Sequence, residues 1–320
     1  MARRIPWRQI VLSVGSATVI LWRVPGAQLR SAFRSLEPRS LFLAGLSALV
    51  LLMLRAYKWH RLMASAGGFR LPQSLRTLLG GCALGLITPG RLGEFGRCMF
   101  VRKHERMRIV ILTFLDRSLD FWALLTLVGV SLFILVGDPA AVFGLGAWLA
   151  LLPVLLGLPG LLAYLAKAMP WSLHLHTPLT EVASDVSPTD MVLYATISLA
   201  AMAVELSAFF FLLRAFAPAG FSTAVATYPY IALAGDLPFS FSGVGIREGA
   251  AAFLLSRYSV SSATAVDATL LWFLLGIVFP AILGTGWLAV EKLKLVVKSC
   301  TAKPAETEPH LEPSAEGSGR

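Results

Sequence analysis

The chain has 320 residues, of which 56% belong to the set AVILMFWYC and only 14% are charged. Soluble domains carry about 25% charged residues, so this sequence lacks the polar side chains that would coat a water-facing surface. The composition excludes a soluble cytoplasmic enzyme and a secreted disulfide scaffold. The net charge of +10 does not indicate a nucleic-acid partner, because the Lys and Arg residues mainly flank apolar runs, as they do in membrane proteins that contact anionic headgroups. We therefore expect an all-α, polytopic membrane protein.

Six apolar stretches are interpreted as transmembrane helices, since a spanning helix needs about 20 mostly apolar residues. The first stretch is the shortest. Its arginine-rich flank resembles the start of a signal peptide, but no convincing cleavage site follows, so we expect an uncleaved first helix. The arginines that come after it leave a helix along the membrane interface as the alternative. The six stretches are Ile10–Trp22, Ser40–Tyr57, Thr113–Gly137, Ala141–Ala166, Met191–Phe216 and Ala265–Val290.

Two further apolar stretches do not fit a full span. Thr77–Thr88 has only twelve residues, which as a helix would cross about half of a bilayer. Phe221–Pro238 is longer, but it is interrupted by proline, glycine and aspartate. Each stretch leads into a glycine-rich turn that contains an arginine and a glutamate. We interpret the two as re-entrant helical hairpins, at about Arg76–Val101 and Phe221–Tyr258.

The distribution of basic residues predicts the orientation. With both termini in the cytoplasm, most Lys and Arg residues fall on the cytoplasmic side, as the positive-inside rule prefers. The exceptions are four arginines between Arg23 and Arg39. The cytoplasmic clusters are then Arg55 to Arg76, Arg102 to Arg108 and Lys292 to Lys303.

In this topology the two hairpins enter the membrane from opposite sides. Such an arrangement is typical of an inverted repeat with a binding site near the midplane. We assign residues 1–298 to the transmembrane domain. Residues 299–320 are rich in Glu and Pro and poor in aliphatic residues, which predicts a disordered cytoplasmic tail.

Charged residues at bilayer depth are the candidate functional residues. Each costs at least about 2.5–3.5 kcal/mol on insertion scales, so each needs a partner or a wet cavity. Asp236 belongs to this charged set but is not selected as a site residue. The predicted substrate-binding residues are Arg91, Glu94, Arg97, Asp116, Arg117, Asp120, Glu205, Arg247 and Glu248.

Three of these carboxylates need a cation from elsewhere. Asp116 and Asp120 share one face of a helix at i, i+4 spacing and would repel each other unless a cation lies between them. Arg117 and the hairpin arginines are the possible partners. Glu205 has no cation within a turn, so either its partner comes from another part of the fold or it is protonated.

The two hairpin tips favour anion binding. Each glycine-rich turn is expected to open a short helix, near Phe95 or Gly249, whose free N–H groups attract an anion. An arginine beside it adds a planar fork suited to phosphate oxygens. The alternative is that the Arg and Glu of each tip only form an ion pair that staples the hairpin. No cofactor or metal is expected, because the cysteines and the loop histidines lack ligand spacing.

Three segments resemble a known family. Thr88–Arg97 (TPGRLGEFGR), Leu115–Asp120 (LDRSLD) and Pro238–Gly249 (PFSFSGVGIREG) are similar to the three signature segments of the lysylphosphatidylglycerol synthase transmembrane region family, the flippase-like integral membrane proteins. The resemblance covers roughly residues 5 to 295. The sequence departs from the family pattern at Asp116, where Glu is usual, and at Ser242, where a second Gly is common.

The resemblance implies a lipid-handling, multi-pass protein of the bacterial inner membrane. Since only a short tail follows the last span, we expect a stand-alone member without the soluble synthase domain, and not an enzyme. The motif residues that carry over as lining a lipid path are Arg91, Glu94, Arg97, Arg117, Asp120, Arg247 and Glu248.

The leading hypothesis is a flippase or transporter for an anionic phospholipid or a polyprenyl-phosphate lipid, with a lipid-synthesising enzyme as a candidate partner. The alternatives are a membrane glycosyltransferase or phosphatase that acts on a lipid-linked substrate, and an accessory protein that presents lipid to an enzyme. The sequence leaves the oligomeric state open.

Overall fold

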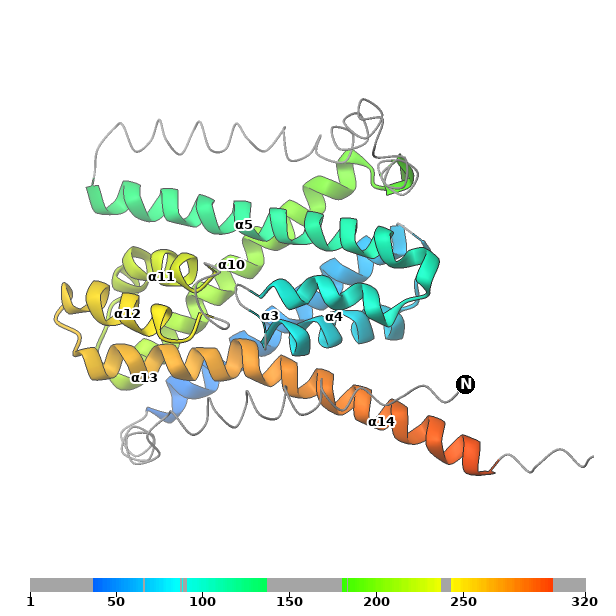
Figure 1. The fold of residues 1–320 in the computed structure, drawn as a ribbon. Coiled ribbons are helices and arrows are strands. Elements are labelled where there is room, and N and C mark those ends of the chain that lie inside the picture. Colours follow the sequence, from blue (N-terminus) through cyan, green and yellow to red (C-terminus); the bar gives the residue numbers. More distant parts are fainter. Residues whose placement is uncertain are drawn as a thin grey trace, which may run out of the picture.

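The computed structural model describes residues 37–65, 67–86, 88, 91–136, 180–182, 184–236 and 243–301, with the backbone alone for 134–136 and 291–301. The elements of this part of the chain are all helical (Figure 1). They are α3 (Pro38–Ser65), α4 (Leu71–Leu86), η1 (Leu92–Phe100), η2 (Lys103–Glu105), α5 (Arg106–Val136), α10 (Pro188–Phe216), α11 (Phe221–Asp236), α12 (Ile246–Ser256), α13 (Ser262–Phe273), η3 (Leu274–Val278) and α14 (Phe279–Thr301).

Three of the described helices are long and apolar enough to cross a membrane: α3, α10 and the continuous helix Ser262–Val290. They coincide with three of the predicted spans. A fourth predicted span overlaps α5 up to Val136; α5 is a single helix of 31 residues that carries charged residues in its first half. Ile10–Trp22 and Ala141–Ala166 lie outside the described residues, so the count of six spans stays a prediction. The apolar helices are those of a multi-pass membrane protein.

Local sequence signals fix where these helices start. Ser187 caps α10 by accepting the N–H of Asp190, and Pro188 occupies the first helical position, where a missing N–H costs nothing. Ser261 caps α13 in the same way by accepting the N–H of Thr264. At Leu274–Val278 the backbone forms a π-helical turn before α14 continues. Such turns often lie at functional sites, and this one faces the cavity described below.

Two pairs of helices form hairpins. In the first hairpin α4 packs against η1, and in the second α11 packs against α12. The close approach depends on glycine: a Cβ on Gly93 would lie 2.2 Å from the Leu84 carbonyl oxygen, and one on Gly243, whose φ is +79°, would lie 2.5 Å from the Gly235 oxygen. In Figure 1 the ends of α4 and η1 that adjoin the first turn face the corresponding ends of α11 and α12, between α5 on one side and the α13–α14 helix on the other.

Candidate functional site: a charged cavity between the hairpin tips

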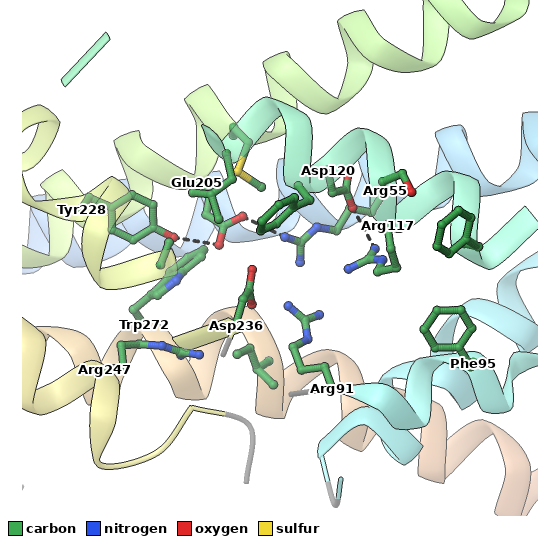
Figure 2. A pocket seen from close by; sticks show the side chains of 17 residues that line it. Arg55, Arg91, Phe95, Arg117, Asp120, Glu205, Tyr228, Asp236, Arg247 and Trp272 are labelled. Atoms are coloured by element: carbon green, nitrogen blue, oxygen red, sulfur yellow. Dashed lines mark hydrogen bonds and ion pairs between the residues drawn. The ribbon is translucent and has the colours of Figure 1, made fainter. Parts of the chain in front are cut away.

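A cavity of about 340 Å³ lies where the two hairpin tips meet (Figure 2). Its wall combines four arginines and three carboxylates with a larger number of apolar side chains. The lining residues are Arg55, Arg91, Phe95, Phe114, Arg117, Ser118, Asp120, Phe121, Leu124, Met202, Glu205, Tyr228, Ala232, Asp236, Arg247, Trp272 and Ile277.

The arginines of the cavity come from four different elements. Arg55 lies on α3, Arg91 directly precedes η1, Arg117 lies on α5 and Arg247 on α12. Their placement brings together guanidinium groups that are far apart in the sequence. The predicted site residues Arg91, Arg117 and Arg247 therefore face one cavity, although Arg91 and Arg247 belong to different hairpins.

Glu205 receives its cation from another helix. Arg55 Nη2 lies 2.8 Å from Glu205 Oε2, and the Tyr228 hydroxyl donates a hydrogen bond of 2.7 Å to the other carboxylate oxygen. The sequence left open whether Glu205 is protonated or is paired with a cation from another part of the fold. In the structure it is paired with Arg55 of α3. Arg55 was assigned to a cytoplasmic cluster, but its side chain is only 13% exposed and faces the cavity.

Behind the cavity wall, a second set of charges is fully buried. Arg97 bridges the first hairpin to α5, since it lies 3.0 Å from Glu94 and 2.8 Å from Asp116. Glu94 and Arg97 point the same way because residues three apart eclipse in a 3₁₀-helix. The Arg97 guanidinium also lies 4.3 Å from the centre of the Trp59 ring, a cation–π contact with α3.

Lys58 supplies the cation that Asp116 and Asp120 require. Its ammonium lies 2.8 Å from Asp116 Oδ1, donates to Asp120 Oδ1 and also donates to the Ser198 hydroxyl at 2.9 Å. Lys58 was predicted to lie in a cytoplasmic cluster beyond the end of the span, but it lies inside α3 and is 1% exposed. The predicted span ended at Tyr57, whereas the helix continues to Ser65.

Arg117 joins this buried network to the cavity. Its guanidinium lies 2.8 Å from Asp120, 3.2 Å from Asp116 and 3.3 Å from Glu94, while a quarter of the side chain stays accessible. Arg91 similarly reaches Glu94 at 2.6 Å and lines the cavity with the rest of its side chain. The ion-pair interpretation of the first tip is therefore correct for Arg91 and Glu94, although Arg91 also faces the cavity.

The second tip is built differently. The guanidinium of Arg247 lies against the backbone of α11, so close that a Cβ added to Gly235 would lie 2.6 Å from Arg247 Nε. The same guanidinium lies 5.8 Å from the centre of the Phe273 ring. Glu248 does not line the cavity. Its carboxylate accepts the N–H of Gly245 at 2.5 Å and so caps the start of α12.

Side chains of the protein itself occupy part of the anion sites that were predicted at the two helix N-termini. The helices begin at Leu92 and Ile246, three residues earlier than expected at each tip. The Thr88 hydroxyl accepts the N–H of Gly93 at 2.6 Å, as Glu248 accepts that of Gly245. The chain's own side chains thus use backbone donors that an anion would need, and the arginines remain as the groups that would bind it.

Several cavity residues were not selected from the sequence. Arg55 and Tyr228 lie in helices whose apolar runs gave no reason to single them out. Asp236 was recognised as a charge at membrane depth but not as a site residue, and it lines the cavity at the end of α11. The signal that could have identified it is its place before the glycine-rich turn of the second hairpin.

The fold and the site define a multi-pass helical membrane protein with a charged cavity between two opposed hairpins. The chain belongs to the family described as the lysylphosphatidylglycerol synthase TM region, which matches residues 8–284. The family indicates a membrane protein that acts on lipids. No curated protein matches the sequence.

Proposed function

We propose that this protein is a lipid transporter that moves a lipid with a negatively charged phosphate headgroup between the two leaflets of the bacterial inner membrane. The observation that carries the proposal is the convergence of Arg55, Arg91, Arg117 and Arg247 on one cavity between the hairpin tips. Guanidinium groups bind phosphate oxygens through paired, charge-assisted hydrogen bonds. The headgroup would cross the membrane in this cavity and avoid the hydrocarbon.

The rim of the cavity favours a ligand with an apolar tail. Phe114 and Phe121 line the cavity together with Arg117, at positions i, i+3 and i+7 of α5, and about half of each phenylalanine is exposed. An arginine flanked by two exposed aromatic rings on one helix face matches a lipid whose phosphate points inward and whose chains stay outside. In this proposal the two hairpins are re-entrant, enter from opposite sides, and both chain termini are cytoplasmic.

Transport is favoured over the enzymatic alternative by the state of the carboxylates. Asp120 and Glu205 are each bound to cations, Asp236 stands between the guanidinium groups of Arg91 and Arg247, and no histidine or cysteine lines the cavity in the described segments. General acid–base or nucleophilic catalysis needs a group that is available to the substrate. We therefore propose that the protein is not an enzyme, and that a lipid-synthesising enzyme supplies its substrate.

The test is lipid translocation in liposomes that contain the purified full-length protein. Fluorescent phospholipids in the inner leaflet are protected from dithionite unless the protein moves them outward. Arg91→Gln and Arg247→Gln are expected to slow translocation about tenfold or more, since each removes one charge from a site of low dielectric. Arg257→Gln is the matched control, because Arg257 is exposed, directly follows the far end of α12 and lies over the Phe253 ring.

Two results would contradict the proposal. Unchanged translocation in both cavity variants, with every lipid tested, would remove the arginines from the lipid path. Absence of translocation by the wild-type protein, together with stable binding of lipid, would instead favour the role of an accessory protein that presents lipid to an enzyme.

A further inference from the structure

The position of Asp236 extends the proposed function. Asp236 is the last residue of α11, and Figure 2 shows its carboxylate between the guanidinium groups of Arg91 and Arg247. One belongs to the first hairpin and the other lies on α12 of the second. Asp236 thus stands between the two arginines that would bind a headgroup phosphate.

The other two carboxylates of the cavity are bound to fixed groups. Glu205 is bound by Arg55 and Tyr228, and Asp120 is bound by Lys58 from behind the wall. Both are therefore part of the wall. Asp236 lies at the tip of its hairpin, where the ligand would bind, so its charge acts directly on the ligand.

The charge balance of the cavity sets the charge of the ligand that fits best. Four arginines and three carboxylates line the cavity in the described part of the chain, an excess of one positive charge. In the buried set behind the wall, Lys58 and Arg97 balance Glu94 and Asp116, while Glu248 is bound to the Gly245 N–H and does not line the cavity. A headgroup with a single negative charge neutralises the excess, whereas one with two or more leaves uncompensated negative charge beside the Asp236 carboxylate.

We propose that Asp236 is a specificity-determining residue that restricts the cavity to lipids with a singly charged phosphodiester headgroup and disfavours phosphomonoester and diphosphate lipids. The discrimination comes from a like charge placed against the unwanted ligand. This inference rests on the proposed function and narrows it, because it favours an anionic phospholipid over a polyprenyl phosphate as substrate.

The experiment compares two lipids that differ only in the phosphate ester. Full-length protein is reconstituted into phosphatidylcholine liposomes with trace fluorescent phosphatidylglycerol, a phosphodiester, or phosphatidic acid, a phosphomonoester, at about pH 8, where the second proton of a phosphomonoester is lost. The wild-type protein is expected to move phosphatidylglycerol faster. Asp236→Asn is expected to raise the ratio of the phosphatidic acid rate to the phosphatidylglycerol rate by about tenfold.

Two control variants isolate the charge of Asp236. Asp236→Glu keeps the charge and is expected to keep the wild-type preference. Asp267→Asn makes the same chemical change on α13, at a residue that does not line the cavity, and is expected to leave the ratio unchanged.

The outcomes separate this inference from the proposed function. An unchanged ratio in Asp236→Asn, with both lipids still moved, overturns the role of Asp236 and leaves transport intact. If Asp236→Asn does not fold, the wild-type measurement still decides: phosphatidic acid moved as fast as phosphatidylglycerol overturns the inference. If the wild-type protein moves neither lipid, the proposed function itself is wrong.

Discussion

The two hairpins carry similar residues at their tips but are held in the fold by different forces. In the first hairpin, Glu94 and Arg97 are at most 1% exposed and form ion pairs that reach Asp116 on α5. In the second, Glu248 caps its own helix and Arg247 packs against glycine backbone and an aromatic ring. The same pair of residue types therefore serves as a structural anchor in one hairpin and as cavity wall and helix cap in the other.

The attachment of the second hairpin to the rest of the fold is mostly apolar. Phe209 on α10 packs on the Tyr228 ring with centroids 4.8 Å apart, and Ser131 on α5 donates a hydrogen bond to the Ala226 carbonyl. A buried ion network has a defined geometry and loses energy steeply when it is displaced, whereas apolar contacts tolerate small shifts. We expect charge removal to unfold the first hairpin and to impair ligand binding at the second.

The largest expected effect is on the anchor of the first hairpin. Arg97→Met removes one of the cations that compensate two buried carboxylates, Glu94 and Asp116, and should destabilise the protein by about 3–5 kcal/mol. Arg247→Met, the same change in the second hairpin, should cost far less stability. The measurement is the thermal loss of the monodisperse peak of detergent-solubilised protein in size-exclusion chromatography. Equal stability of the two variants would abolish the distinction between the hairpins.

The next effect concerns the glycines that let each hairpin close. Gly93→Ala brings a methyl group against the Leu84 carbonyl, and Gly243→Ala adds one at a residue with positive φ. Each should cost about 1–3 kcal/mol in the same assay. Gly249→Ala is the control, since a Cβ there meets open space inside α12. It should be neutral or slightly stabilising, and a similar loss in all three variants would mean that close packing is not the cause.

The sequence was informative where the chemistry is local. The turns around Gly93 and Gly243, with their arginines, predicted two pairs of packed helices, because irregular backbone and charge are conspicuous within apolar sequence. That these hairpins are re-entrant stays a prediction. The pairing of Arg91 with Glu94 was also predictable from spacing. The family match confirmed the resemblance that these segments carry.

The remaining part of the site depends on contacts that no spacing reveals. Lys58 meets Asp116 across 58 residues of sequence, and Arg55 meets Glu205 across 150. A hydropathy window ends a span at such charges, whereas in the structure α3 continues through them because partners from α5 and α10 compensate them. Which charged residues form ion pairs can be told only once it is known how the helices pack together.

The smallest expected effect tests how the second hairpin is tied to the cavity charges. The Tyr228 hydroxyl is a polar contact of α11 with Glu205, and it leaves the Arg55 pair intact when removed. Tyr228→Phe should therefore cost about 0.5–1.5 kcal/mol, the usual net contribution of one hydrogen bond, while the ring packing on Phe209 is kept. Tyr230→Phe on the same helix is the control. A loss as large as that of Arg97→Met would show that the second hairpin also depends on a polar anchor. The two hairpins would then differ in where this anchor lies and not in the kind of interaction that holds them.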